Sequence, residues 1–140
     1  LDGIVAALAS TTTSTSGAVY ARFGLAGVEI GSITRNAATS AVLYNTSSDA
    51  RLKSTITPFS DALERVCAIE AGSFEWKHNG AIGHGVIAQH LHTIYPDAVA
   101  PGKTEDEMWA VDYGKLTPLL IGAVQELKAE LTALRNATHG

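Results

Sequence analysis

The sequence changes character at Asn45-Thr-Ser-Ser-Asp-Ala-Arg-Leu-Lys53. Up to this point, residues 1–47 carry only two acidic and two basic side chains and are rich in Thr, Ser, Ala and Gly. Such a segment cannot bury enough apolar surface alone to offset the entropy lost on ordering, so it is either disordered or ordered by strand pairing with neighbours. Residues 48–140 instead show the patterns of a small folded domain. We therefore divide the chain into two domains, 1–47 and 48–140.

Apolar residues recur at strand spacing in the later part of the upstream domain. Positions two apart lie on one face of a strand, and β-branched and aromatic residues favour strands. We predict short strands separated by glycine turns at Gly24, Gly27 and Gly31. A flexible linker is the alternative interpretation. The residues that define the strands are Val19, Ala21, Phe23, Val28, Ile30, Ile33, Val42 and Tyr44.

The first part of the downstream domain alternates between helical and strand patterns. Thr57 and Pro58 supply a cap and a first-turn proline for an amphipathic helix that Gly72 ends. Apolar residues on both sides of Asn79-Gly80 predict a β-hairpin. A short helix follows and stops at Pro96. The predicted elements are a helix over 58–70, a hairpin over 74–87, a short helix over 88–95 and a strand over 108–111.

The last part of the chain carries a heptad pattern. Its apolar residues are spaced four, three, four and three positions apart, which places them on one stripe of a helix. We predict a long C-terminal helix that packs against copies of itself as a coiled coil, and a helix packed on its own domain is the alternative. The predicted fold class is α+β. The stripe consists of Leu120, Val124, Leu127, Leu131 and Leu134.

Ser48 and Lys53 are the residues of the dividing stretch best suited to catalysis. A serine hydroxyl and a lysine that takes its proton form a known variant of the nucleophile and base of peptidases. Positions i and i+5 do not share a face of a helix or a strand, so the two side chains can meet only across a turn or across subunits. A lysine base also needs a lowered pKa, which burial in an assembled oligomer would impose.

Four motifs, taken in order, resemble those of the S74 peptidase family. This family comprises the C-terminal intramolecular chaperone domains of phage tail fibres, tailspikes and endosialidases. The resemblance covers roughly residues 28 to 135. Four motifs in register are far more specific than any one of them. The motifs are Ser48-Asp-Ala-Arg-Leu-Lys53, Gly85-Val-Ile-Ala-Gln89, Pro96-Asp-Ala-Val99, and Val111-Asp-Tyr-Gly-Lys-Leu116 with Gln125-Glu-Leu127.

The resemblance implies an elongated, intertwined homotrimer. The upstream domain would be the C-terminal end of a fibre shaft, and the downstream domain would drive its trimerisation and folding and then release itself. The implied partners are other copies of the chain and the upstream segment of the same chain. The implied location is a virion tail fibre precursor made in the host cytoplasm, and the released domain is not retained in the mature virion. A first residue other than Met suits an excised piece of a longer protein.

The resemblance also assigns the site residues. It implies a self-cleaving serine peptidase that acts once, with Ser48 as the nucleophile, Lys53 as the base and Ser47-Ser48 as the scissile bond. The alternative role for Lys53 is a stationary cation that stabilises the oxyanion. In this interpretation Asp49 holds Arg51 or caps a turn, and it has no catalytic role.

The sequence departs from the family pattern after Ile87-Ala-Gln89. The family leads us to expect an acidic residue next, and this chain has His90. Gln89 and His90 are therefore candidate supporting residues, and cleavage is slow or absent if the missing acid orients the catalytic groups. Two alternatives remain open: a structural trimerisation cap that does not cleave, and a receptor-binding tip that stays on the fibre.

Composition narrows the classes of partner. Hydrophobic residues make up 46% of the chain but aromatic residues only 6%, which predicts a thin core better suited to an oligomer than to a monomer. A net charge of -4 and a pI near 5.7 leave no basic surface for nucleic acid. No apolar run approaches the length needed to span a bilayer, so we expect no membrane partner.

We expect no cofactor and no metal. Gly83-His-Gly-Val-Ile-Ala88 fits a loose dinucleotide-binding pattern, but no buried parallel-sheet strand precedes it. Four histidines between residues 78 and 92 lack zinc spacing, although His90 and His92 could share a strand face. Cys67 lies in an apolar helical pattern and is expected to be a buried structural thiol.

Overall fold

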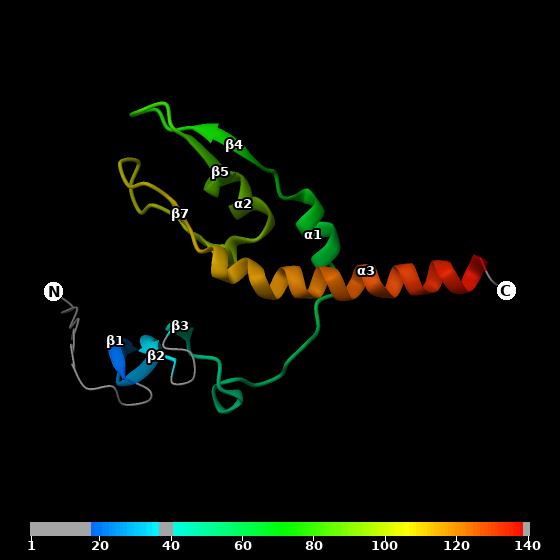
Figure 1. The fold of residues 1–140 in the computed structure, drawn as a ribbon, viewed down its shortest axis with the longest axis horizontal. Coiled ribbons are helices and arrows are strands. Elements are labelled where there is room, and N and C mark those ends of the chain that lie inside the picture. Colours follow the sequence, from blue (N-terminus) through cyan, green and yellow to red (C-terminus); the bar gives the residue numbers. More distant parts are fainter. Residues whose placement is uncertain (1–17, 37–40, 139–140) are drawn as a thin grey trace. The chain divides into compact units, whose positions relative to one another are not determined.

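The computed structural model describes residues 18–36 and 41–138. The chain divides into two compact units, residues 1–56 and 57–140, each with a fold of its own (Figure 1). Its class is α+β, as predicted, with antiparallel strands in both units and a long C-terminal helix in the second. Residues 1–17 and 37–40 of the predicted upstream domain lie outside the described residues.

The first unit is a three-stranded antiparallel sheet in the order β1-β2-β3. Ala26 and Gly27 form the turn between the first two strands, with φ angles of 49° and 81°. Positive φ at both turn positions matches the twist of the flanking strands and favours a tight hairpin. The predicted strands are thus confirmed. They are β1 (Val19–Leu25), β2 (Val28–Arg35) and β3 (Val42–Thr46).

Only one of the three predicted glycine turns is correct. Gly27 lies at the β1–β2 turn, whereas Gly24 lies in β1 and Gly31 in the middle of β2. A Cβ atom at Gly31 would lie 2.8 Å from the carbonyl oxygen of Asn45 in β3. Glycine at this position therefore permits a close approach between neighbouring strands, which the sequence pattern did not distinguish from a turn.

The sheet buries little apolar surface. Among the described residues of the first unit, only Gly31 and Ser32 are buried. Large apolar side chains such as Phe23 and Ile30 are exposed, and Tyr44 is 81% exposed. Because hydrophobic burial is the main favourable term in folding, the hydrogen-bonded ladder alone gives this sheet little stability.

Over its described residues 57–138, the second unit has three α-helices and two small antiparallel sheets. The predicted order of a helix, a hairpin, a short helix and a long helix is confirmed. A loop with Gly80 at φ 70° closes the β4–β5 hairpin. The elements are α1 (Ala62–Ala68), β4 (Ala71–Glu75), β5 (Ile82–Val86), α2 (Ala88–Ile94), β6 (Val99–Ala100), β7 (Ala110–Val111) and α3 (Leu116–Thr138).

Two of these elements are shorter than predicted. α1 begins at Ala62 rather than Pro58, and Gly72 lies inside β4 instead of ending the helix. β7 has two residues, because its only partner is the equally short β6, and Met108 is exposed before it. Both differences arise because the segment pairs with another element. The periodicity of one segment gives no information about its partner.

The N-terminus of α1 is capped by a residue far away in the chain. The backbone N–H groups of Ala62 and Leu63 donate to the carboxylate of Glu126 on α3 at 3.1 and 2.8 Å. Asp61, which precedes the helix, binds Arg65 instead of a backbone N–H group. A carboxylate here satisfies free N–H groups at the positive end of the helix dipole. The start of α1 is therefore set by its packing on α3, and the predicted cap at Thr57-Pro58 is wrong.

The core of the second unit lies between α1, α2 and α3. Among the described residues, only Leu91 and Leu119 are large side chains that are fully buried, so the core is thin, as composition predicts. Figure 1 shows α1 against the middle of α3. At this contact a Cβ on Gly122 would lie 2.9 Å from the Phe59 ring and 3.0 Å from the Ala62 Cβ, so glycine lets the helices approach closely.

The predicted apolar stripe of α3 does not take part in this packing. Leu119, Gly122 and Ala123 are the buried residues of the helix, whereas Leu127 of the stripe is 52% exposed. The helix packs on its own domain through these three buried residues, as the alternative interpretation expects, and the coiled coil stays a prediction. The C-terminal part of α3 extends beyond α1 (Figure 1). No helix of residues 18–36 and 41–138 combines the length and the apolar character that a membrane span requires.

Candidate active site

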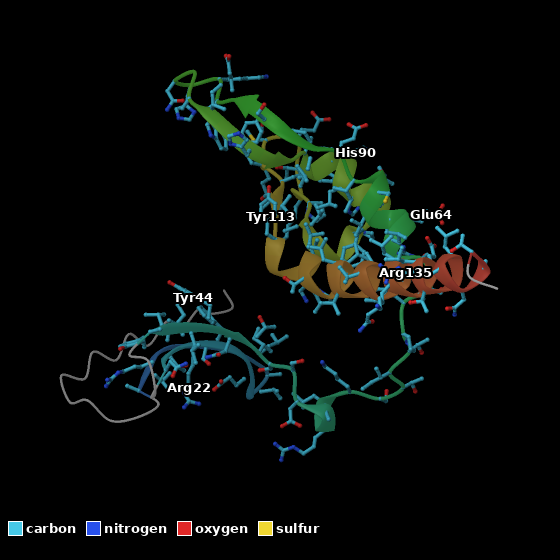
Figure 2. The ribbon with its side chains drawn as sticks, turned by 45° about the vertical axis from the view of Figure 1, so that its right-hand side comes forward. Arg22, Tyr44, Glu64, His90, Tyr113 and Arg135 are labelled. Atoms are coloured by element: carbon cyan, nitrogen blue, oxygen red, sulfur yellow. The ribbon has the colours of Figure 1, made fainter. Side chains whose placement is uncertain are left out.

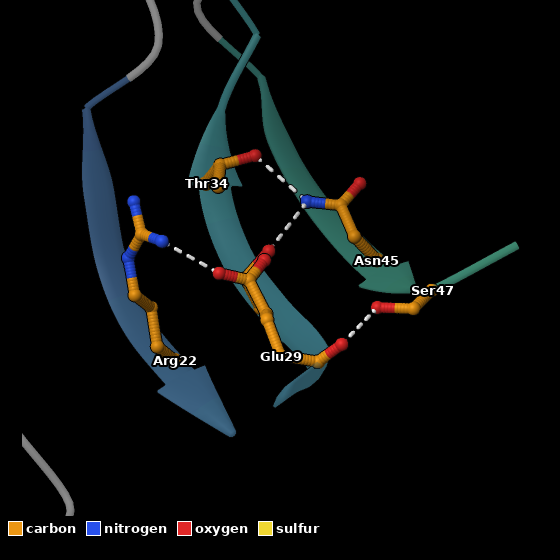
Figure 3. Close-up of polar contacts among 6 residues, drawn as sticks. Arg22, Glu29, Thr34, Asn45 and Ser47 are labelled. Atoms are coloured by element: carbon orange, nitrogen blue, oxygen red, sulfur yellow. Dashed lines mark hydrogen bonds and ion pairs between the residues drawn. The ribbon is translucent and has the colours of Figure 1, made fainter. Parts of the chain in front are cut away.

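Ser47 is held by the sheet of the first unit. It directly follows β3, and its backbone N–H donates to the carbonyl oxygen of Ile30 at 3.1 Å. Its hydroxyl donates to the carbonyl oxygen of Glu29 at 2.7 Å (Figure 3). Ser47 therefore continues the ladder between β2 and β3, and the acyl side of the predicted scissile bond is tied to the sheet.

Asn45 ties the end of β3 to β2 by its side chain. Its amide nitrogen donates to the Thr34 hydroxyl at 2.9 Å and to the Ser32 hydroxyl at 3.3 Å (Figure 3). Cross-strand polar pairs of this kind help to define the register of a sheet. Asn45, two residues before Ser47, thus has a defined position along β2.

A single turn brings Ser48 and Lys53 together. Residues Ala50–Leu52 form the 3₁₀ turn η1, in which Leu52 N–H donates to Asp49 O and Lys53 N–H donates to Ala50 O, both at 3.1 Å. This reversal of the chain places Lys53 Nζ 2.6 Å from Ser48 Oγ, where the ammonium donates to the hydroxyl. Of the two arrangements that the sequence left open, the structure shows the one across a turn.

Asp49 and Arg51 lie between the two residues and bind each other. Asp49 accepts from Arg51 Nε at 3.0 Å and from Nη2 at 2.7 Å, a two-pronged ion pair. Asp49 also accepts the backbone N–H of Arg51 at 2.8 Å and so caps η1. Hydrogen bonds from the Arg51 side chain, and then from its backbone, hold the Asp49 pKa below its ordinary value of 3.8. Both predicted roles of Asp49, holding Arg51 and capping a turn, are present.

The site is open to solvent in the single chain. None of the residues of η1 is buried, and Ser48 and Lys53 are exposed. Two large apolar side chains in the same stretch, Leu52 and Ile56, are also exposed.

The two candidate supporting residues belong to the second unit. Gln89 is exposed and His90 is half-buried near the start of α2. His90 also lines a cavity of about 280 Å³ together with Glu70 and Ser73. The pair that the structure assembles is therefore Ser48 with Lys53.

The structure corrects two further expectations, one about the histidines and one about Cys67. His90 and His92 lie on helix α2 and not on a strand, because the short apolar pattern before Pro96 is helical. Cys67 is exposed rather than buried, because α1 turns its opposite side toward α3. Within the described parts of the chain, no group of three or more His, Cys, Asp and Glu residues is arranged to hold a metal ion.

Comparison with known families agrees with the motifs. Residues 48–100 match the family model Peptidase_S74, described as the chaperone of endosialidase. The match begins at Ser48, the residue at which the sequence analysis placed the new N-terminus. No curated protein and no solved structure gave a match. The predicted resemblance is confirmed over residues 48–100.

Sequence reasoning missed the attachment of the predicted scissile bond to the sheet. Ser47 was assigned to the cleavage site only as the neighbour of Ser48, yet its hydroxyl and its N–H both bind β2. If the alternating strand pattern of β3 is extended by one residue, it includes Ser47. This extension could have predicted that Ser47 pairs with β2. The bond to Glu29 itself joins residues 18 positions apart and has no local signature.

Proposed function

We propose that residues 48–140 are an intramolecular chaperone that drives trimerisation and folding of the preceding phage tail fibre or tailspike and then releases itself. Release is autoproteolysis of the bond between Ser47 and Ser48. The observation that carries the proposal is the 2.6 Å contact between Lys53 Nζ and Ser48 Oγ at the first residue of the family match. It lies directly after a residue held by the sheet, so the cut would separate shaft from chaperone.

The reaction balances with one water molecule and no cofactor. Ser48 Oγ attacks the carbonyl carbon of Ser47 while the hydroxyl proton passes to the neutral amine of Lys53. The peptide C–N bond then breaks, and the proton returns to the Ser48 nitrogen. This leaves an ester between the Ser47 carbonyl and Ser48 Oγ. Water hydrolyses the ester to a Ser47 carboxylate and a free Ser48 hydroxyl.

Such a reaction needs no substrate pocket. The nucleophile and the carbonyl it attacks are adjacent in one chain, and well-oriented intramolecular reactions reach effective molarities on the order of 10⁵ M or more. The open surface around Ser48 is therefore compatible with a cleavage that occurs once. The ordered sheet on one side and the turn on the other reduce the motion of the reacting groups.

Assembly is the proposed control of cleavage. An ordinary lysine side chain is a charged ammonium, and it becomes a base only after it loses a proton. Covering Lys53 in an assembled trimer removes water and favours the neutral amine. In the alternative role, Lys53 stays charged and stabilises the oxyanion. The two roles predict opposite dependence on the ionisation of Lys53, since only the base requires its loss.

Two exposed apolar surfaces support the trimer. The strands of the first unit and the stripe of α3 both expose large apolar side chains, and each would be covered by copies of the same chain. The proposed partners are thus two further copies and the upstream segment of the same chain. The proposed location is a virion tail fibre precursor in the host cytoplasm, with the released domain absent from the mature virion.

A second candidate function is a trimerisation cap that does not cleave. The exposed stripe of α3 favours it, because this surface serves assembly whether or not the chain is cut. His90 in place of an acidic residue favours it too. In this case the chain stays whole after folding and remains on the fibre.

Intact mass spectrometry of the folded protein tests the proposal, beside native mass spectrometry for its assembly. We expect the parent to give two fragments divided between Ser47 and Ser48, and Ser48→Ala to remain whole. Ser54→Ala, which removes another exposed hydroxyl of the same loop, serves as the control and should be cut like the parent. An uncut trimer in the parent would establish the cap and exclude autoproteolysis.

A further inference from the structure

The ion pair between Asp49 and Arg51 occupies the middle of the turn that joins the nucleophile to its lysine. We propose that Asp49 and Arg51 form a clip that positions Lys53 against Ser48 during cleavage. The inference rests on the proposed function, because it concerns the geometry of that reaction. Neither residue touches the reacting atoms, so both are positioning residues.

The first argument is the number of bonds that converge on Asp49. Its carboxylate accepts the backbone N–H, Nε and Nη2 of Arg51, and its backbone carbonyl accepts the N–H of Leu52. Arg51 and Leu52 are thus both hydrogen-bonded to Asp49. The next link, from Lys53 N–H to Ala50 O, completes the turn. The backbone position of Lys53 relative to Ser48 therefore follows from the Asp49 contacts.

The second argument is that the turn has no other support. No residue of η1 is buried, and its one large apolar side chain, Leu52, is 62% exposed, so burial contributes little to holding the turn. A short polar turn in water exchanges its hydrogen bonds readily for bonds to solvent. A planar guanidinium bound by both oxygens of a carboxylate is the ion pair with the most defined geometry. The Asp49–Arg51 ion pair therefore orders this turn, whereas burial orders the core of the second unit.

The third argument is the flexibility of the lysine side chain. Its four-carbon stem has many rotamers, and an exposed stem loses them only when its own attachment point is fixed. Lys53 Nζ lies 2.6 Å from Ser48 Oγ although the residue is exposed. Fixing its backbone therefore decides how often the amine meets the hydroxyl.

A double-mutant cycle measures the clip. The first-order cleavage rate of chains that have assembled, as judged by native mass spectrometry, is followed by intact mass in the parent, Asp49→Ala, Arg51→Ala and the double variant. We expect each single variant to be slower by about 10- to 100-fold, the range in which small misplacements of reacting groups fall. The double variant should be no slower than the slower single one, because both remove the same contact.

Conservative variants separate positioning from a general loss of structure. Asp49→Asn keeps an acceptor for the Arg51 N–H but loses the ion pair, so its rate should lie between those of the parent and Asp49→Ala. Arg65→Ala is the matched control. It breaks another arginine–aspartate ion pair, with Asp61 at 2.7 Å at the start of α1 in the second unit. Its rate should equal that of the parent.

The outcomes separate this inference from the proposed function. A parent that stays as whole as Ser48→Ala overturns both. A parent that is cut, with clip variants that cleave at its rate, overturns the clip alone. Slowing that multiplies in the double variant also overturns it, because the two residues would then act independently.

Discussion

The turn of residues 47–53 and the core of the second unit hold their side chains in place by different means. In the turn, named hydrogen bonds among exposed groups do so, and none of η1 is buried. In the core, small residues such as Ala62 and Gly122 let helices pack around Leu119. The difference teaches that the proposed chemistry lies in a part of the chain that lacks a core. In the proposal, further copies of the chain would have to exclude water there.

The largest expected effect concerns Lys53. Lys53→Met should lower the cleavage rate of the assembled protein by at least about 100-fold, the usual contribution of a positioned acid or base. Lys103→Met, an exposed lysine of the second unit, serves as the control and should not change it. Intact mass against time gives both rates. A Lys53→Met chain that cleaves like the parent would contradict both roles assigned to this lysine.

The next effect concerns assembly. Leu127→Asp places a charge on the exposed stripe of α3, and the trimer should dissociate at concentrations where the parent is trimeric, because each copy would bury that charge. The fold of the second unit should persist, since Leu127 is not in its core. Native mass spectrometry measures the oligomeric state, and circular dichroism measures whether the fold persists. Gln125→Asp, on another face of the helix, should stay trimeric.

A smaller effect is expected within the core. Glu126→Ala removes the acceptor of two N–H groups at the start of α1, and the free energy of unfolding should fall by about 1–3 kcal/mol. Thermal or chemical denaturation measures it. Glu130→Ala, an exposed carboxylate of the same helix, should change stability by no more than about 0.5 kcal/mol. Equal losses in the two variants would mean that the cap contributes nothing.

The attachment of the proposed scissile bond to the sheet predicts a smaller change. Ser47→Ala loses the bond to Glu29 O but keeps the backbone bond to Ile30 O, so cleavage should slow by a factor of about three, the worth of one ordinary hydrogen bond. Ser47→Thr retains the hydroxyl and should restore the rate. Cleavage unaffected by Ser47→Ala would show that the backbone bond suffices.

The smallest effect is the pH dependence of the clip. The folded Asp49 pKa is depressed by Arg51, so the ion pair contributes fully above the ordinary value of 3.8 and is lost as pH falls through the lower, folded value. The carboxyl carbon of Asp49, followed by NMR, should titrate below 3.8 in the parent and nearer to it in Arg51→Ala. Equal titration in both would show that Arg51 does not bind this carboxylate in solution.

Local patterns predicted most of the elements. Strand alternation identified β1 to β3, Pro96 correctly limited α2, and apolar spacing identified α3. Patterns failed where a second element decides the outcome. The start of α1 depends on Glu126, and the place of Gly31 depends on Asn45 in the neighbouring strand. Neither Glu126 nor Asn45 can be predicted as a partner from the sequence of the segment that it contacts.

The sequence by itself determined the class of the fold and singled out Ser48 and Lys53 as a pair, because periodicity and short motifs are local. Only the tertiary structure decided how that pair meets, which face of α3 the domain uses and what holds Ser47. The physical reason is that hydrogen bonds and close packing join residues far apart in the chain. Their partners are selected by the geometry of the folded backbone and not by spacing along it.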